Sequence, residues 1–163
     1  MKRVTITISL CLSVLTLSAA PISPEVHAIV LDIGTALGVP RSVADRLQIE
    51  ESGDPHTGTW GCADAIGPVD CYGSRSRGLF QISTRWQNYL VGLYYPHPEK
   101  YFDWANPIDN AIVALGYLAD LHRYLGTWER ALWFYNSGRV TEVPESTKAY
   151  AARIVSWPGS PGK

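Results

Sequence analysis

The strongest constraint on the fold is a long apolar pattern that begins after Asn106 and ends at Gly126. Asn106 is a residue type that caps helices, Pro107 is favoured at the first helical position, and Gly126 is typical of a helix end. Between them, apolar residues recur every three or four positions, which predicts a long helix with one apolar face. These residues are Ile108, Ile112, Leu115, Leu118 and Leu125.

The rest of the chain repeats this kind of helical pattern in shorter pieces. Residues 53–77 are an exception, because they contain five glycines and no clear period, and we expect a loop there. No pair of segments alternates as strands do, so the predicted fold class is mainly α, in one domain for 163 residues. Further helices are predicted near residues 24–37, 41–52, 84–92, 128–136 and 146–155.

The N-terminal segment has the features of a secretory signal peptide. Lys2 and Arg3 precede an uncharged, apolar-rich stretch that ends in the small residues Ala19 and Ala20. An uncleaved membrane anchor is the alternative, although the strongly apolar part is shorter than the roughly 20 residues of a spanning helix. We therefore expect a signal peptide at residues 1–20, a folded domain at 21–157 and a flexible tail at 158–163, with export to the periplasm or the extracellular space.

Charge and cysteine content bear on two questions, which are whether the chain binds nucleic acid and whether its cysteines form a disulfide. Lys and Arg number 14 against 15 Asp and Glu, without a basic cluster, so we expect no nucleic-acid partner. Loss of the signal peptide would remove Cys11 and leave Cys62 and Cys71. An even number of cysteines in an exported chain predicts a disulfide between these two, and two free thiols are the alternative.

Neither metal-ligand spacing nor a nucleophile motif is present. The four histidines are scattered, and neither His-Glu-x-x-His nor a paired Cys-x-x-Cys occurs. No Gly-x-Ser-x-Gly motif suggests a serine nucleophile. We therefore expect neither a metal site nor a serine nucleophile.

Two adjacent glutamates end the helix predicted at residues 41–52, and helical geometry separates them. Glu51 follows Val43 and Leu47 at intervals of four, so it continues the apolar stripe. Glu50 follows Arg46 by four residues, and we expect that pair to lie in water on another side. Loss of solvation and the negative helix C-terminus both favour a protonated Glu51, which suits a general acid. The alternative is that Glu51 frays into solvent where the helix ends.

Five short motifs follow one another along the chain. They are Glu51-Ser52-Gly53, Ser76-Arg77-Gly78-Leu79-Phe80-Gln81-Ile82, Asn106-Pro107 with the helix it opens, Ala131-Leu132-Trp133-Phe134-Tyr135-Asn136-Ser137-Gly138, and Ser146-Thr147-Lys148-Ala149-Tyr150. In this order the chain resembles the soluble lytic transglycosylase domain of the lysozyme-like superfamily, with goose-type lysozymes as near relatives. The resemblance implies a lysozyme-like single domain with a cleft.

The resemblance also implies roles for particular residues. Glu51 would be the catalytic acid and base, with Gln81, Tyr135 and Asn136 lining the sugar cleft. Ser52 and Phe80, inside the matching motifs, are likewise expected to bind substrate. For Tyr135 the alternative is a core aromatic residue, and for Gln81 it is a cap between loop and helix.

The activity implied is cleavage of the β-1,4 bond between N-acetylmuramic acid and N-acetylglucosamine by a single glutamate, with a 1,6-anhydromuramoyl product. This mechanism implies no cofactor. The partner would be the glycan strands of peptidoglycan, and we expect a monomer, with a secretion or conjugation apparatus as a further possible partner. One alternative is a goose-type muramidase, which would use Asp64 or Asp70 as a second carboxylate, although Ser83 stands where those enzymes can carry aspartate. The other is a wall-binding module without catalysis.

Overall fold

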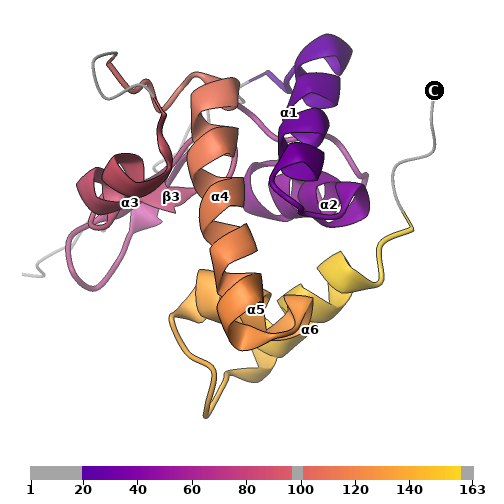
Figure 1. Ribbon diagram of the computed structural model, residues 1–163, viewed down its shortest axis with the longest axis vertical. Helices are drawn as coiled ribbons and strands as arrows, with labels where there is room; N and C mark the ends of the chain where they lie inside the picture. The colour runs from indigo at the N-terminus through magenta and orange to yellow at the C-terminus, as the bar shows by residue number, and fades with distance from the viewer. Residues whose placement is uncertain (1–19, 97–100, 159–163) are drawn as a thin grey trace, which may run out of the picture.

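The computed structural model describes residues 20–96 and 101–158, and the elements named below lie in these two ranges. Six helices and a three-stranded sheet form this part of the chain, which is therefore mainly helical, as predicted (Figure 1). In chain order the elements are α1 (Pro24–Ala36), α2 (Arg41–Ser52), β1 (Ile66–Val69), β2 (Arg75–Arg77), β3 (Ile82–Ser83), α3 (Gln87–Tyr94), α4 (Pro107–Leu125), α5 (Trp128–Ser137) and α6 (Glu145–Val155).

The long helix α4 is the centre of the fold. Figure 1 shows α1 and α2 on one side of it, α3 on the other, and α5 and α6 near its C-terminal end. Asn106 caps α4 by accepting hydrogen bonds from two backbone amides, and Gly126 ends it in the left-handed conformation. Because α1, α3 and α5 all pack on α4, it is buried more widely than the single predicted apolar face. Its fully buried apolar residues are Ala111, Val113, Ala114, Leu115 and Leu118.

The predicted helices are confirmed with small shifts of their ends. The helix α2 has the predicted bounds, and α1, α5 and α6 differ from the predictions by one residue at an end. The helix α3 begins three residues later and ends two residues later than predicted. Each accurate start follows a proline or a capping residue, such as Ser23 before α1 and Thr127 before α5.

The sheet was not predicted from the sequence. Its strands are antiparallel in the order β1-β2-β3, and Arg77 pairs with Ile66 on one side and Ile82 on the other. Most residues of β1 and β2 are exposed or half-buried, so no alternation of apolar and polar residues marks them. The predicted loop at residues 53–77 is therefore partly sheet.

The predicted disulfide between Cys62 and Cys71 is wrong for this structure, in which the two sulfur atoms are not bonded to each other. The strand β1 lies between the two residues and carries the chain about 10 Å at roughly 3.3 Å per residue. A disulfide needs Cα atoms within about 7 Å. Cys62 pairs in a bridge with Pro21, whereas Cys71 is exposed in the turn after β1.

The predicted signal peptide, apart from Ala20, lies outside the described residues, and so does most of the predicted tail. The first described residues are hydrogen-bonded to the loop after α2. Pro21 forms the bridge with Cys62, and the amide of Ile22 donates to the carbonyl of Gly61 at 3.0 Å. Within the described ranges, we find no helix both long and apolar enough to cross a membrane.

Candidate active site

A cleft of about 750 Å³ lies between the sheet and the helices α3 and α5. Glu51, at the end of α2, lines the cleft, and so does Gln81, at the end of the turn that leads into β3. The opposite wall comes from the C-terminal half of α5, with Tyr135 and Asn136. Three of the residues predicted for the site, together with the predicted catalytic acid, thus line one cleft.

Glu51 reaches the cleft because of its place on α2. Val43 and Leu47 precede it on the same stripe and are buried against the core, so the stripe delivers its last member to the inner side of the helix. The side chain of Glu51 is only partly exposed. Its Oε1 accepts a hydrogen bond from the hydroxyl of Tyr150 on α6. Glu51 is therefore held by tertiary contact and does not fray into solvent.

The surroundings of Glu51 favour its protonated form. Burial raises the pKa of Glu51, the hydrogen bond from Tyr150 lowers it, and the negative charge of Glu50 raises it, with a net value of about 7. A carboxyl with that pKa is protonated in a large fraction of molecules at neutral pH. Because Tyr150 donates to Oε1, Oε2 is left to carry the proton. The group is suited to donate a proton and then to accept one.

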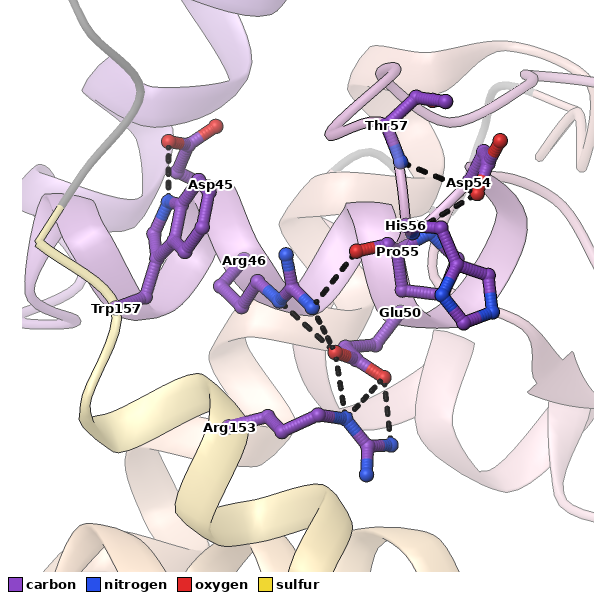
Figure 2. A network of polar contacts seen from close by, with 9 residues as sticks. All are labelled: Asp45, Arg46, Glu50, Asp54, Pro55, His56, Thr57, Arg153 and Trp157. Carbon is purple, nitrogen blue, oxygen red and sulfur yellow. Dashed lines mark hydrogen bonds and ion pairs between the residues drawn. The ribbon is translucent and has the colours of Figure 1, made fainter.

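Glu50 is the centre of a separate polar network, made of residues that do not line the cleft (Figure 2). Arg46 donates from Nε to its Oε1 at 2.8 Å, and Arg153 on α6 donates from Nη2 to its Oε2 at 2.8 Å. The Glu50 side chain is only 3% exposed, so the predicted pair with Arg46 forms, but the expectation that it lies in water is wrong. Burial acts to raise the pKa of Glu50, yet the hydrogen bonds from Arg153 and Arg46 outweigh it and the pKa is lowered. The two neighbouring glutamates thus have opposite protonation preferences.

The turn that carries Gln81 is fixed from α4. Asn110, fully buried on that helix, accepts from the amide of Phe80 at 2.8 Å and donates to the carbonyl of Arg77 at 3.3 Å. Gln81 has a φ of 49°, an uncommon conformation for a residue other than glycine. Its Nε2 donates to the carbonyls of Gly78 at 2.9 Å and Ala65 at 3.2 Å. These contacts tie the turn to the loop before β1 and hold Gln81 at the cleft.

Tyr135 and Asn136 are positioned by hydrogen bonds to other parts of the fold. The hydroxyl of Tyr135 donates to the carbonyl of Phe80 at 2.8 Å, so this ring faces the cleft while its polar end is already bonded. Burial and the charge of Glu51 raise the pKa of Tyr135 well above its usual value, which keeps the hydroxyl protonated. Oδ1 of Asn136 accepts from the hydroxyl of Thr147 at 2.9 Å. Its amide N–H groups are thereby oriented as donors.

Two residues predicted to bind substrate do not line the cleft. Ser52 donates its hydroxyl to the carbonyl of Leu79 at 2.7 Å and, at 3.3 Å, to that of Gln48, so it joins α2 to the turn before β3. Phe80 is fully buried in the core. Both residues position the cleft residues indirectly. Phe80 supplies the carbonyl that accepts from Tyr135, and Ser52 holds Leu79, the residue before Phe80.

The candidate second carboxylates are placed differently from each other. Asp70 lines the cleft, whereas Asp64 lines a smaller, separate pocket of about 270 Å³. Ser83 also lines the cleft. Across residues 20–96 and 101–158, no group of three or more His, Cys, Asp or Glu side chains is placed to hold a metal ion.

Tyr150 is the functional residue that sequence reasoning missed. It lies within a motif of the last helix, but no local pattern connects it with Glu51, which is 99 positions away in the chain. The one available signal is its spacing on α6, where Thr147, Tyr150 and Ile154 fall on one buried face.

Comparison with known families gives one match. The model of the transglycosylase SLT domain family matches residues 47–155. No curated protein and no solved structure matches the chain. The matched region begins within α2 and ends with α6, so it contains every residue that lines the cleft.

Proposed function

The chain belongs to the transglycosylase SLT domain family, whose members act on the glycan strands of peptidoglycan, and from this we propose that it is an exported lytic transglycosylase. The bond cleaved would be the β-1,4 linkage between N-acetylmuramic acid and N-acetylglucosamine. The observation that carries the proposal is Glu51, partly buried in the cleft, with a pKa of about 7 and a fixed hydrogen bond to Tyr150.

Glu51 is proposed to act first as acid and then as base. Its Oε2 proton passes to the glycosidic oxygen, the bond from that oxygen to C1 of the muramic acid breaks, and N-acetylglucosamine leaves with a free hydroxyl. The acetamido oxygen of the substrate stabilises the cationic sugar. The C6 hydroxyl then bonds to C1 and returns its proton to Glu51. The product is a 1,6-anhydromuramoyl end, and no water is consumed.

The other cleft residues are proposed to hold the sugars. Tyr135 offers a ring face, since its hydroxyl is bonded to Phe80, and aromatic faces pack on the apolar side of a sugar ring. Asn136 offers amide donors, because its Oδ1 is bonded to Thr147. Gln81 is held at the cleft by its two backbone partners.

Replacement of the acid tests this assignment. We expect Glu51→Gln to lower the rate of muropeptide release from purified peptidoglycan by at least about 10²-fold, the usual contribution of a general acid. Binding to insoluble peptidoglycan, measured by sedimentation, should be retained. A variant as active as the unmodified chain would refute the role of Glu51. If the unmodified chain bound peptidoglycan and released nothing, the wall-binding module would be the correct class.

The hydrolytic alternative has one observation in its favour, which is that Asp70 lines the same cleft. However, Oδ1 of Asp70 accepts hydrogen bonds from the amides of Tyr72 and Ser74, both at 2.8 Å, and is thus used in the turn. Mass spectrometry of the released muropeptides separates the two reactions, because hydrolysis adds one water to each product. Reducing ends in place of anhydro ends would reject the transglycosylase mechanism.

Export by cleavage of residues 1–20 is also a proposal. It is supported by the tie between Pro21 and Cys62, which places ordered structure directly after the expected cleavage point. The mass of the secreted protein gives its N-terminus, which we expect within two residues of Pro21. Retention of residues 1–20 in the exported protein would contradict the proposal. A monomer is expected, and light scattering tests it.

A further inference from the structure

The guanidinium of Arg85 contacts two exposed aromatic rings on the rim of the cleft. Cζ of Arg85 is 4.2 Å from the ring centroid of Tyr72 and 5.4 Å from that of Trp86. All three residues line the cleft and are exposed. Tyr72 comes from the turn between β1 and β2, whereas Arg85 and Trp86 directly precede α3. Two separate segments thus build this part of the rim, which we call the Arg85 rim.

Arg85 carries a positive charge in the cleft without an ion-pair partner among the described residues. Among the described residues that line the cleft, Arg85 is the only arginine or lysine, and Glu51 and Asp70 are the acidic residues. Asp70 uses Oδ1 within its own turn, as described above. Arg85 forms no ion pair with any carboxylate in residues 20–96 and 101–158. Within these described residues, no ion pair neutralises its positive charge.

Stacking on aromatic rings fixes the position of a guanidinium group without occupying its N–H donors. A guanidinium over a ring is held by cation–π attraction, and its N–H donors in the guanidinium plane remain available. Two parallel N–H donors match the two oxygens of a carboxylate. The Arg85 rim therefore has the features of a site for a planar anion beside a sugar-binding cleft.

We propose that Arg85 binds a carboxylate carried on the muramoyl unit of the glycan. This inference rests on the proposed function, because it takes the cleft to hold peptidoglycan strands. Two sources of carboxylate exist on such strands. The lactyl group of muramic acid is a free carboxylate where no peptide is attached, and an attached peptide has carboxylates of its own. Either would give the enzyme a preference for muramoyl glycan over uncharged N-acetylglucosamine polymers.

Binding of soluble strands to a non-cleaving protein tests the proposal. The parent is Glu51→Gln, and the probes are peptide-bearing strands and the same strands after an amidase has removed the peptides. Each probe is also used after carbodiimide coupling with ammonia, which converts its carboxylates to amides. We expect addition of Arg85→Gln to weaken binding by about tenfold on strands with carboxylates, and to have no effect on amidated strands.

The two strand types identify the source of the carboxylate. A loss confined to peptide-bearing strands assigns the peptide carboxylate, and a loss confined to amidase-treated strands assigns the lactyl carboxylate. Arg85→Lys should recover only part of the affinity, because lysine keeps the charge but loses the paired donors. Arg130→Gln is the matched control, since Arg130 is exposed on α5 with the same charge and does not line the cleft.

Three results would overturn the proposal. They are unchanged binding of Arg85→Gln to both strand types, an equal loss on amidated strands, and an equal loss in Arg130→Gln. Failure of the proposed function is seen separately, in the unmodified chain. If that chain cleaved no strand, the transglycosylase assignment would fail, while the binding comparison would still decide the role of Arg85.

Discussion

At the scale of single residues, opposing influences determine the protonation state of Glu51. Burial and the charge of Glu50 favour the protonated carboxyl, and the hydrogen bond from Tyr150 favours the carboxylate. The proposed acid step needs the protonated form, so activity should fall as the pH rises through about 7. The pH dependence of activity therefore reports the pKa of Glu51.

We expect Tyr150→Phe to move the upper limb of the pH profile to higher pH. The substitution removes the one contact that lowers the pKa of Glu51, so the carboxyl keeps its proton at a higher pH. The maximal rate should also fall, because Glu51 loses the contact that orients it. The measurement is kcat/KM on soluble glycan strands between pH 5 and 9. A limb that stays in place or moves to lower pH would contradict this account.

The raised pKa of Glu51 also predicts a cost in stability. The folded state binds the Glu51 proton more tightly than the unfolded state, whose pKa is near 4.5, so stability is lost as the pH rises from 4.5 through about 7. Glutamine does not titrate. We expect Glu51→Gln to be more stable than the unmodified chain by up to about 3 kcal/mol at pH 8. Urea unfolding should show little difference at pH 4, and a constant difference at both pH values would refute the linkage.

Sequence reasoning at this scale worked where local geometry decides and failed elsewhere. The interval of four residues on α2 was enough to distinguish Glu51 from Glu50 by direction. It could not show that Glu50 is buried, because Arg153 is 103 positions away. The same limit applies to Ser52 and Phe80, whose partners are distant in the chain. A motif identifies residues of a site without saying which of them face the substrate.

At the scale of elements, the joint between α4 and the turn before β3 places Gln81. Gly78 in this turn has a φ of 79° and lies against Asn110 on α4. A Cβ atom there would be 2.3 Å from Nδ2 of Asn110 and 2.7 Å from the carbonyl oxygen of Trp104. The turn and the helix therefore approach too closely for any side chain.

We expect Gly78→Ala to destabilise the fold by more than its backbone conformation alone explains. Gly126 is a matched control, because it has a φ of 83° and nothing within 4 Å of a Cβ atom. Gly126→Ala should cost about 1–2 kcal/mol for the left-handed conformation. Gly78→Ala should cost more and should lower activity, since Asn110 must move. Equal costs in chemical denaturation would show that the close approach is unimportant.

Helices were predicted from the sequence and strands were not, because the two are stabilised differently. Helices begin and end with local signals, such as Ser23, Asn106 and Thr127, which the sequence displays. The strands β1, β2 and β3 have only two to four residues, and the residues of β1 and β2 are all exposed or half-buried. Their partners lie within 18 residues of sequence, but strands this short and this exposed show no alternation of apolar and polar residues. For that reason the sheet, with the extended strand β1 between Cys62 and Cys71, was missed.

At the scale of the whole molecule, the network around Glu50 joins α2 to α6. Arg153 makes three hydrogen bonds to Glu50, and Trp157 after α6 donates to Asp45 at 3.0 Å while its ring lies 4.6 Å from Cζ of Arg46 (Figure 2). The helix that carries Glu51 is thereby fixed to the C-terminal end of the described chain.

We expect Arg153→Met to destabilise the protein by about 1–3 kcal/mol, because it removes hydrogen bonds from a buried carboxylate and leaves Arg46 as its cationic partner. Arg123→Met is the control. Its pair with Asp120 is exposed, at 75% and 41% of the side chains, so little change is expected. Thermal unfolding of both variants measures the difference. A similar loss in both would mean that burial of Glu50 contributes nothing.

The bond between Glu51 and Tyr150 also makes the site depend on the last helix of the fold. The two residues are 99 positions apart, so their contact closes most of the described chain into one loop, and closing it costs conformational entropy. A chain cut before α6 would keep Glu51 but lose the hydroxyl that orients it. Integrity of the C-terminal helix is therefore a condition for a correctly held carboxyl group in the cleft.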